Sequence, residues 1–460
     1  MSRLSLSAFC ITRGIAASIL IVISVDSLTV GAAERGSSSQ PLERVKVSAD
    51  GRGFELVPSG RPFVPWGFNY DHDTQGQLLE DYWESDWDRV VDDFREMKAL
   101  GANVVRIHLQ VSRFLEAPDR ANEANVERLK RLFRRAEEIG LYLDVTGLGC
   151  YHRQDVPAWY DALDENGRWA AQAFFWETIA RAGTGCPAVF CYDLMNEPVV
   201  PGEKRKDGDW LVDAALGGKY FVQRITLDPR GRPRNEIARD WVRRLTTAIR
   251  KHDTEALVTV GLLPGTKDRA DAWSGFVPKE LAPPLDFIST HIYPEKNAID
   301  VSLQILSHFA VGRPVVVEET FPLRCSTQEL TEFLRASRGT ATGWIGFYWG
   351  TPPDELRQSK ELAAHITAGW LELFQELTPE FRQPRVVHPA WLQASFRRSL
   401  RNGFALFKGG VISRRVLFLV AVPSSLGTRL KQTLSPRLRS FLLKWLFCPQ
   451  KSGPSSNGCN

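Results

Sequence analysis

The last part of the chain contains no acidic side chain. All 54 Asp and Glu residues lie at or before Glu380, whereas residues 381–460 carry fourteen Lys and Arg. Residues 1–380 hold 44 basic and 54 acidic groups, a net charge of −10, although the whole chain stands at +4. Such a bias indicates a basic, acid-free tail separate from the folded body. Either a disordered tail or a basic amphipathic helix on anionic lipid would fit it.

Two further absences reduce the number of possible fold classes. The seven Cys show neither a metal-ligand spacing nor a repeated disulfide framework, and although Cys186 and Cys191 lie close together we predict no pairing. No Gly-rich phosphate loop follows the first predicted strand, which argues against an open dinucleotide-binding sheet. With 43% hydrophobic residues, the chain can nevertheless bury a large core.

The N-terminus has the pattern of an export signal. Arg3 and Arg13 accompany an apolar stretch over residues 15–25, and small residues follow at 31–33. The stretch is short for a membrane-spanning helix. We therefore expect a signal peptide over residues 1–33, a polar linker over 34–44 and a secreted or periplasmic protein. An uncleaved membrane anchor is the alternative.

Between residues 45 and 375, short apolar runs alternate with longer amphipathic stretches, most of them helical in period. The pattern predicts an α/β fold, a (β/α)8 TIM barrel, with an open doubly wound sheet as the alternative. We expect a short N-terminal β-hairpin over residues 45–57 to cover the barrel floor. The predicted strands are residues 63–69, 103–109, 141–145, 188–195, 256–260, 285–289, 314–317 and 344–348.

Two of these strands end on carboxylates. The fourth runs into Asn196-Glu197-Pro198, and the seventh into Glu318-Glu319. A parallel barrel gathers the C-terminal ends of its strands at one mouth, so these side chains can meet there. Two carboxyl groups facing each other are what cleavage of a glycosidic bond requires. Polar or aromatic residues at the other strand ends are Asn69, Tyr70, Arg106, His108, Thr146, His291, Tyr293 and Trp349.

These motifs resemble glycoside hydrolase family 5, the cellulase and mannanase family, over about residues 45–375. Asn196-Glu197-Pro198 is similar to the family's Asn-Glu-Pro motif, and Glu319 resembles its strand-seven nucleophile. One departure stands out: Thr146 occupies the place of a histidine common in the family, and His108 or His152 could substitute for it. The other matches are Arg106 on strand two, His291-Ile292-Tyr293 on strand six, and Trp349 beneath the sugar subsite.

The resemblance implies a retaining hydrolase of β-linked glycans, β-glucan or β-mannan, that acts by double displacement without cofactor or metal. Glu197 would be the acid/base and Glu319 the nucleophile. Glu318 is the rival nucleophile, but strand alternation allows only one of the two to face the mouth, and the family's spacing favours Glu319. Substrate-binding residues would be Arg106, Asn196, His291, Tyr293, Trp349, His108 and Asn69.

We expect an oligo- or polysaccharide as the partner, no nucleic acid, at most a weak membrane-surface contact through the tail, and a monomer. The long charged loop over residues 201–233 is expected to wall one side of the cleft. Two alternatives stay open. A glycan-binding barrel without activity would normally lack one glutamate. A zinc hydrolase would use His108, His152 and His291, but no His-x-His occurs on strand one. The sugar, the linkage and endo or exo action are not predicted.

Overall fold

The computed structural model describes residues 41–70, 76–212, 218–264 and 274–383. All of them belong to one compact unit, Met1–Arg385. The predicted signal peptide, residues 34–40 of the linker and nearly all of the predicted tail lie outside the described residues. Among the described helices, none is long and apolar enough to cross a membrane.

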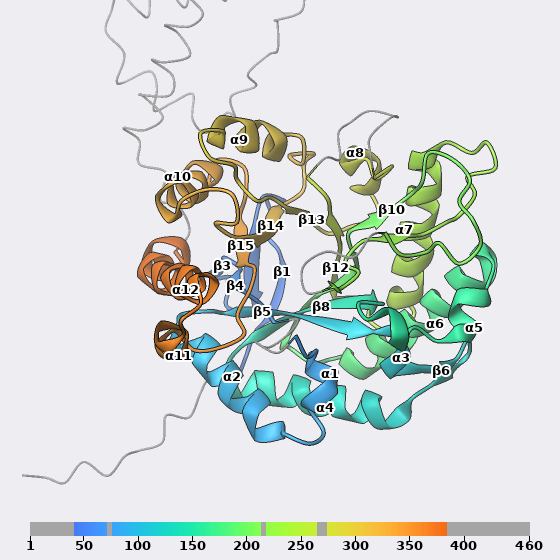
Figure 1. Cartoon of the computed structure of the whole chain (residues 1–460), viewed down its shortest axis with the longest axis horizontal. Helices are drawn as coiled ribbons and strands as arrows, with labels where there is room; N and C mark the ends of the chain where they lie inside the picture. The colour runs from blue at the N-terminus through green and yellow to red at the C-terminus, as the bar shows by residue number, and fades with distance from the viewer. Residues whose placement is uncertain (1–40, 71–75, 213–217, 265–273, 384–460) are drawn as a thin grey trace, which may run out of the picture. The chain divides into compact units, whose positions relative to one another are not determined.

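Eight parallel strands close into a barrel, which confirms the predicted fold class (Figure 1). Around the barrel, each strand pairs with the strand before and after it in the βα alternation, and the last, β15, pairs with the first, β4. The barrel strands are β4 (Trp66–Tyr70), β5 (Val104–Gln110), β8 (Tyr142–Gly149), β9 (Val189–Asn196), β12 (Leu257–Leu262), β13 (Ile288–His291), β14 (Val315–Thr320) and β15 (Gly343–Gly346).

Helices follow the strands and surround the barrel in Figure 1. The longer ones are α2 (Trp87–Ala99), α4 (Glu123–Ile139), α6 (Glu165–Gly183), α7 (Arg234–Arg250), α9 (Ile299–Ser307), α10 (Thr327–Ser337) and α12 (Leu362–Phe381). Short helices in the connections are α1 (Leu79–Tyr82), α3 (Val111–Phe114), η1 (Arg153–Asp155), α5 (Ala158–Ala162), α8 (Pro278–Leu281) and α11 (Pro353–Gln358). Two short strand pairs, β6 (Leu115–Ala117) with β7 (Arg120–Ala121) and β10 (Pro198–Val199) with β11 (Gln223–Arg224), complete the loops.

Local signals in the sequence set the ends of several long helices. Helix α4 stops at Gly140, whose φ of 83° is the left-handed conformation that glycine adopts without strain. Helix α2 is capped by Asp86, whose side chain accepts the N–H of Arg89. Helix α12 runs past the predicted domain end at residue 375, and its Phe381 stacks on Trp66 with ring centroids 4.8 Å apart.

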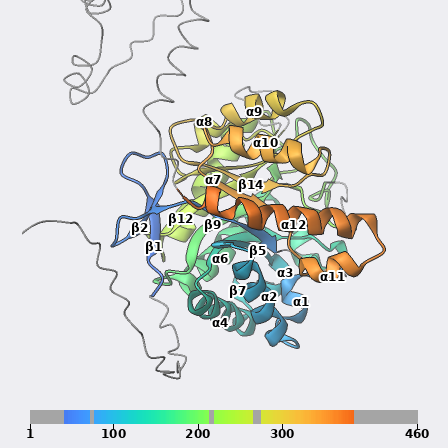
Figure 2. The ribbon, with the colours of Figure 1, turned by 90° about the vertical axis from the view of Figure 1, so that its left-hand side faces the viewer.

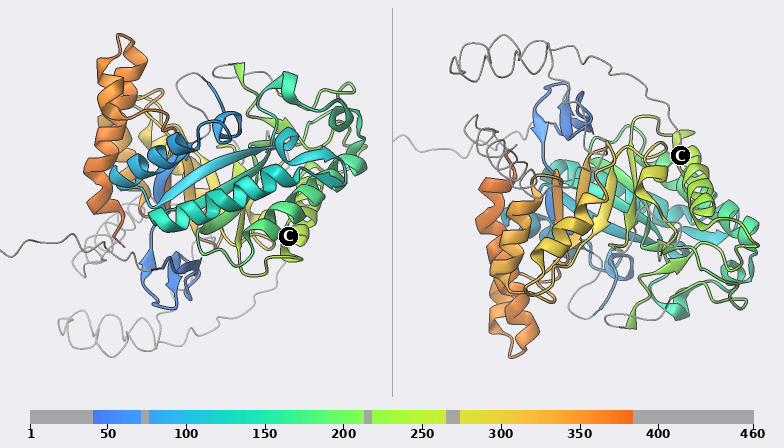
Figure 3. Two further views of the ribbon diagram at one scale, coloured as in Figure 1. Left: turned by 90° about the horizontal axis from the view of Figure 1, so that it is seen from below. Right: turned by 90° about the horizontal axis from the view of Figure 1, so that it is seen from above.

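A three-stranded antiparallel sheet covers one end of the barrel, formed by β1 (Arg44–Val47), β2 (Phe54–Val57) and β3 (Pro62–Phe63). The predicted first strand, 63–69, is therefore two strands, since β3 ends at Phe63 and β4 begins at Trp66. Phe54 and Phe63 pack on Phe190, at the start of β9, with centroids 5.3 and 5.9 Å away. The sheet thus seals the N-terminal ends of the barrel strands, and α11 lies at the opposite end (Figure 2, Figure 3).

Candidate active site

The C-terminal ends of the barrel strands bring the predicted site residues to the end opposite the small sheet. Catalytic residues of this fold are found at that end, because eight loops converge there. The residues are Asn69 on β4, Arg106 and His108 on β5, Thr146 on β8, Asn196 on β9, His291 on β13 and Glu319 on β14, with Glu197, Tyr293 and Trp349 one, two and three residues after the ends of β9, β13 and β15.

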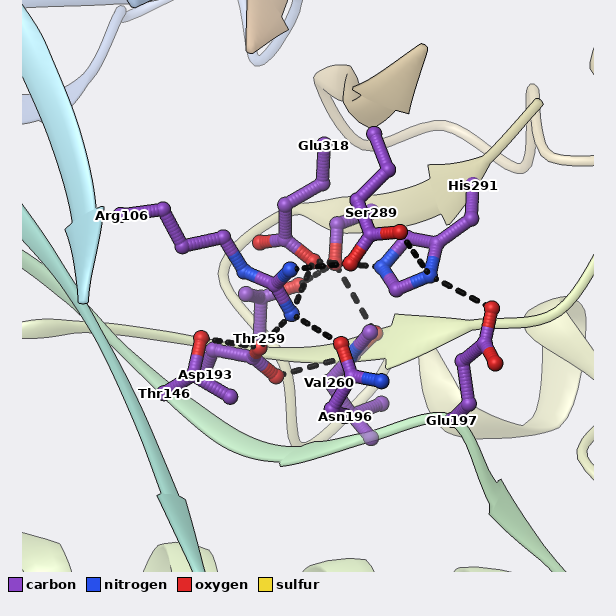
Figure 4. A network of polar contacts seen from close by, with 12 residues as sticks. Arg106, Thr146, Asp193, Asn196, Glu197, Thr259, Val260, Ser289, His291 and Glu318 are labelled. Carbon is purple, nitrogen blue, oxygen red and sulfur yellow. Dashed lines mark hydrogen bonds and ion pairs between the residues drawn. The ribbon is translucent and has the colours of Figure 1, made fainter. Parts of the chain in front are cut away.

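Arg106 joins four strands at the centre of this end. Its fully buried guanidinium donates through Nη1 to Asn69 Oδ1 at 2.8 Å and to Glu319 Oε1 at 2.6 Å. Through Nη2 it donates to Asp193 Oδ2 at 2.7 Å and Asn196 Oδ1 at 3.0 Å (Figure 4). A guanidinium carries five N–H donors in one rigid plane, so a single side chain can fix all four acceptors.

Two donors hold the Glu319 carboxylate. Arg106 reaches Oε1, and the Tyr293 hydroxyl donates to Oε2 at 2.6 Å. The side chain is only 7% exposed. Burial raises the pKa of Glu319 above its usual range, and the neighbouring Glu197 adds to the rise, against the opposing charges of His291 and Arg106. The carboxylate is therefore fixed in direction and largely withdrawn from water.

Glu197 lies where the backbone turns out of β9. Its φ of 47° falls in the left-handed region, which costs a non-glycine residue about 1–3 kcal/mol. Its N–H donates to the Gly261 carbonyl on β12 at 3.0 Å, and its Oε1 lies 2.9 Å from His291 Nδ1. Strain of this kind is typical of functional positions, where the surrounding structure holds a side chain in a required direction.

Glu197 and Glu319 lie close together. One oxygen of each and one nitrogen of His291 all lie within 4.8 Å of one another. In retaining glycosidases the two carboxyl groups are about 5–5.5 Å apart, whereas inverting enzymes need about 6.5–9.5 Å to admit a water between them. The spacing is compatible with the retaining arrangement.

Asn69 and His108 form a second row of polar contacts beside Arg106. Asn69 accepts from Arg106, and its Nδ2 donates to the Glu318 carbonyl oxygen at 2.9 Å. His108 Nε2 lies 3.2 Å from Asn69 Oδ1, and its Nδ1 lies 2.6 Å from the Tyr151 hydroxyl. His108 is therefore part of the network around Arg106.

Thr146 does not occupy a histidine's role. Its hydroxyl donates to Asp193 Oδ2 at 2.8 Å, so it supports the carboxylate that in turn holds Arg106. His152, the other predicted substitute, is partly exposed and begins the short helix η1. Of the two histidines, His108 is the one that contacts a proposed site residue, Asn69.

The long loop after β9 reaches into the site through Phe221. Its carbonyl accepts Asn196 Nδ2 at 3.0 Å. Its ring packs edge-to-face on Tyr151, with centroids 5.1 Å apart, and on Phe347 at 6.4 Å. The loop therefore touches residues that follow β8, β9 and β15, consistent with a wall of the cleft. The sequence did not single out Phe221, because a loop aromatic carries no periodic signal.

Trp349 is fully buried. Its ring centroid lies 5.8 Å from that of Tyr70, and its backbone N–H donates to the Asn69 carbonyl at 3.0 Å. Among the described residues its indole N–H has no hydrogen-bond partner. The ring is part of the packed wall of the site, whereas the resemblance led us to expect a platform open to a sugar.

Glu318 corrects the expectation from strand alternation. Thr290 pairs with Val317 but His291 pairs with Glu319, so Glu318 is the extra residue of a β-bulge. Both glutamates consequently face the barrel axis. Glu318 Oε2 lies 3.7 Å from Arg106 Nη2 and 3.5 Å from His291 Nε2. Strand alternation therefore does not place the two side chains on opposite faces, because a bulge interrupts the two-residue period. Glu319 lies with Glu197 and His291, and Glu318 lies with the fully buried Asp144 and Asp193.

A second group of carboxylates lies inside the barrel. Asp144, Asp193 and Glu318 are fully buried, and one oxygen of each lies within 4.8 Å of the others. Arg106 contacts Asp193 and Glu318 and so supplies positive charge there. Burial raises the pKa of Asp144 well above its usual range, and the negative Glu318 adds to the rise. The sequence offered one signal for this group: Asp144 and Asp193 interrupt apolar strands.

The three histidines of the zinc alternative do not form one cluster of ligand atoms within the described part of the chain. His108 faces Tyr151 and Asn69, whereas His291 faces Glu197, Glu318 and Glu319. The observed neighbours of His291 are carboxylates that also contact Arg106 or each other. The described residues therefore do not form the three-histidine zinc site of that alternative, although Glu197, His291 and Glu319 together could hold a metal ion.

Comparison with protein-family models shows which family the chain belongs to. The sequence model of cellulase, glycosyl hydrolase family 5, matches residues 67–309, more than half of the chain. The chain belongs to glycosyl hydrolase family 5. The matched range includes every predicted site residue except Glu319 and Trp349. Comparison with curated proteins gives no match.

Several solved structures share the fold at low sequence identity. The exo-β-1,4-mannosidase of Opitutaceae bacterium strain TAV5 superposes with a TM-score of 0.55 and 20% identity, covering 74% of this chain and 62% of that one. The β-1,4-mannanase of the sea hare Aplysia kurodai gives 0.50 and 16%, covering 75% and 100%. The endo-1,4-β-mannanase of Eisenia fetida gives 0.50 and 15%, covering 72% and 95%. Identities this low establish the barrel and no substrate.

Proposed function

We propose that this family 5 member is a retaining glycoside hydrolase that cleaves β-linked glycans with Glu197 as general acid/base and Glu319 as nucleophile. The observation that supports it most is the approach of one oxygen of each glutamate to within 4.8 Å, with a donor on each oxygen of Glu319. This spacing suits direct attack on the anomeric carbon by one of two neighbouring carboxyl groups, as a retaining enzyme requires.

The first half of the reaction joins Glu319 to the sugar. The carboxylate attacks the anomeric carbon while Glu197 gives its proton to the leaving oxygen. Arg106 and Tyr293 keep the Glu319 oxygens oriented for attack. In the second half, Glu197 takes a proton from a water that displaces Glu319. Asn196 has one amide hydrogen bonded to Phe221, which leaves the other for the substrate's 2-hydroxyl.

The proposed substrate is β-mannan or β-glucan. We would test β-mannan first, because the structurally similar barrels include a β-1,4-mannosidase and a β-1,4-mannanase. The substrate is an oligo- or polysaccharide, and the protein acts as a monomer without cofactor. A glycan-binding barrel without turnover and a metal-dependent hydrolase are the competing functions. Loss of turnover after chelator treatment would favour the latter.

The deciding experiment measures hydrolysis of aryl β-mannosides, aryl β-glucosides and the corresponding polysaccharides. Glu197→Gln and Glu319→Gln should each lower kcat by about a hundredfold or more, because each removes a group that acts in the transition state. Melting curves of both variants control for the fold. Near-native turnover in either folded variant would contradict the assigned roles.

We further propose that residues 1–33 direct export and that the basic tail makes at most a weak contact with anionic lipid. The catalytic domain is proposed to span residues 45 to about 381, since α12 continues beyond the boundary at 375. Mass determination of protein recovered from outside the cell would show whether the first 33 residues are removed.

A further inference from the structure

Glu318 is a buried carboxylate that the proposed reaction does not use. It is fully buried, and its charged neighbours include Arg106 and His291. The bulge in β14 turns it toward His291, whose Nε2 lies 3.5 Å from Glu318 Oε2. The other nitrogen of the same ring, Nδ1, lies 2.9 Å from Glu197 Oε1 (Figure 4). One imidazole therefore lies between Glu318 and the proposed acid/base.

The two contacts restrict where the protons of His291 are. A neutral imidazole has one N–H and one lone pair, and a lone pair cannot face an ionised carboxylate favourably. With Glu318 ionised, Nε2 carries a proton. If Nδ1 were unprotonated, it would accept the proton of Glu197 and keep that proton from the leaving oxygen. If Nδ1 is protonated as well, it donates to Glu197 Oε1, and the acid proton is placed on Oε2.

The surrounding charges favour the doubly protonated ring. His291 faces Glu197 after β9 and both Glu318 and Glu319 on β14. Burial lowers the pKa of His291, but these three carboxylates outweigh it and raise the pKa to about 10. For Glu318, burial raises the pKa, but the positive charges of Arg106 and His291 outweigh burial and lower the pKa to about 2.

The remaining charged and titratable groups near His291 come from the neighbouring strands. Arg106 on β5 contacts Glu318 and Glu319, and Tyr293 donates to Glu319. Asp193 on β9 and Asp144 on β8 lie with Glu318 in the inner group. These groups contact the carboxylates around His291, and the positive Arg106 keeps Glu318 ionised beside the ring.

A glycine leaves space for this arrangement. On β12, a Cβ added to Gly261 would lie 3.0 Å from His291 Nε2, 3.1 Å from Arg106 Nη2 and 3.2 Å from Glu318 Oε2. Three polar atoms thus converge on one backbone position, where any side chain would push them apart. The convergence independently places Glu318, His291 and Arg106 in one compact group.

We propose that Glu318 is a positioning residue that acts through His291 on Glu197, holding His291 as an imidazolium whose Nδ1–H bonds to Glu197 Oε1. The inference rests on the proposed acid/base role of Glu197. In the first step the Glu197 proton on Oε2 passes to the leaving oxygen, the C1–O bond breaks and a bond from Glu319 to C1 forms. The carboxylate left on Glu197 keeps the hydrogen bond from His291, and it takes its proton back from water in the second step.

The kinetic test compares leaving groups in Glu318→Gln, which keeps the shape and removes the charge. A dinitrophenyl glycoside needs little protonation of its leaving oxygen, whereas a phenyl glycoside needs it fully. We expect kcat/KM to fall about tenfold more for the phenyl than for the dinitrophenyl substrate. Equal losses on both substrates would mean a structural role only and would overturn the proposal.

Two variants serve as controls. Asp144→Asn replaces the neighbouring buried carboxyl with an amide of the same shape without touching His291, and it should leave the ratio of the two kcat/KM values unchanged. Glu318→Asp retains the charge and should restore most of that ratio. A ratio altered as much by Asp144→Asn as by Glu318→Gln would assign the effect to the packing of the whole inner group, against the proposal.

A titration of His291 needs no turnover and so separates this inference from the proposed function. With isotope-labelled histidine, nuclear magnetic resonance should show His291 charged through neutral pH in the native chain, with its signal identified by loss in His291→Gln. In Glu318→Gln the midpoint should move down by at least one pH unit. If the native ring is neutral at pH 7, or if its midpoint does not move, the proposal fails, whether or not the enzyme turns over.

Discussion

Arg106 is the side chain on which the geometry of the site depends most. It connects Asn69, Asp193, Asn196 and Glu319, and it is buried with no exposed surface. Burial lowers the pKa of Arg106, but the carboxylates around it, Glu318 first, raise the pKa well above its usual range, so it stays charged. A buried cation of this kind orders the site because the groups around it would otherwise repel one another.

Arg106→Lys should therefore damage the site although it keeps the charge. A lysine ammonium cannot reach four acceptors held in one plane, so several buried oxygens would lose their donor. We expect kcat/KM to fall at least about a hundredfold and stability to drop by about 3–5 kcal/mol, the usual cost of breaking a buried pair. Steady-state kinetics and denaturant unfolding measure the two effects. An unchanged kcat/KM would contradict the central place given to this residue.

The raised pKa of Glu319 predicts the acid side of the pH profile. The nucleophile must be ionised, and burial raises its pKa above the ordinary 4.5. Activity should therefore be complete above that raised pKa and disappear as the pH falls through it, so the acid limb of kcat/KM should lie above 4.5. A profile of kcat/KM against pH tests this, and an acid limb below 4.5 would show that the hydrogen bonds outweigh burial.

At the level of single residues, the sequence predicted the functional residues at the strand ends but not the residues that hold them in place. Glu197, Glu319 and Arg106 stand where apolar runs stop, so the pattern pointed to them. Asp144 lies inside an apolar run, and its partners come from other strands, which no local pattern records. Phe221 lies in a loop, where neither period nor propensity marks one residue above another.

At the level of elements, the pairing of neighbouring strands fixes the register that brings the site residues together. At Gly67 the backbones of two paired strands leave no space for a side chain. In β4, a Cβ on Gly67 would lie 1.8 Å from the carbonyl oxygen of Val104, its partner on β5. Backbone atoms cannot move aside as a flexible side chain can. The strands β4 and β5 carry Asn69 and Arg106, so a change in their spacing would reach the site.

Gly67→Ala should accordingly lower the melting temperature by several degrees or prevent folding, as overpacking costs about 1–3 kcal/mol and more against rigid backbone. Gly202→Ala is the matched control, because nothing lies within 4 Å of its added Cβ. Calorimetry of both variants gives the comparison. Equal melting temperatures would show that the barrel relaxes at this position.

The elements also show the limit of periodic patterns. Seven of the barrel strands begin and end within a few residues of the predicted runs, because buried parallel strands are continuously apolar. The first predicted strand was divided, since Pro65 separates a floor strand from a barrel strand. The bulge at Glu318 could not be foreseen, because an inserted residue changes the pairing and leaves the sequence pattern as it was.

At the level of the whole molecule, the described residues up to Phe381 contain all eight strands of the closed barrel and the last helix that packs on it. Helix α12 packs Phe374 and Phe381 on Trp66, at centroid distances of 4.3 and 4.8 Å. All of the proposed site residues lie between Asn69 and Trp349. The catalytic function should therefore reside in this unit, and the basic tail should act separately from it.

A chain ending at Gln383 should keep its melting temperature within a few degrees and its kcat/KM within about twofold, because no proposed site contact is removed. A chain ending at Glu361 lacks α12 and exposes Trp66, so it should fail to fold; burying a large aromatic contributes about 3–5 kcal/mol. Melting curves and kinetics of both truncations distinguish the two cases. Loss of activity in the longer truncation would assign the tail a part in catalysis.

The most direct test of the proposed double displacement is to trap the sugar on its nucleophile. A 2-deoxy-2-fluoro aryl β-glycoside of the preferred sugar slows both steps, and its good leaving group lets the first one proceed. After digestion, mass spectrometry should find the added sugar on Glu319, and none on the Glu319→Gln variant. An adduct on Glu318, or active enzyme that hydrolyses β-glycosides with inversion and forms no adduct, would contradict the account.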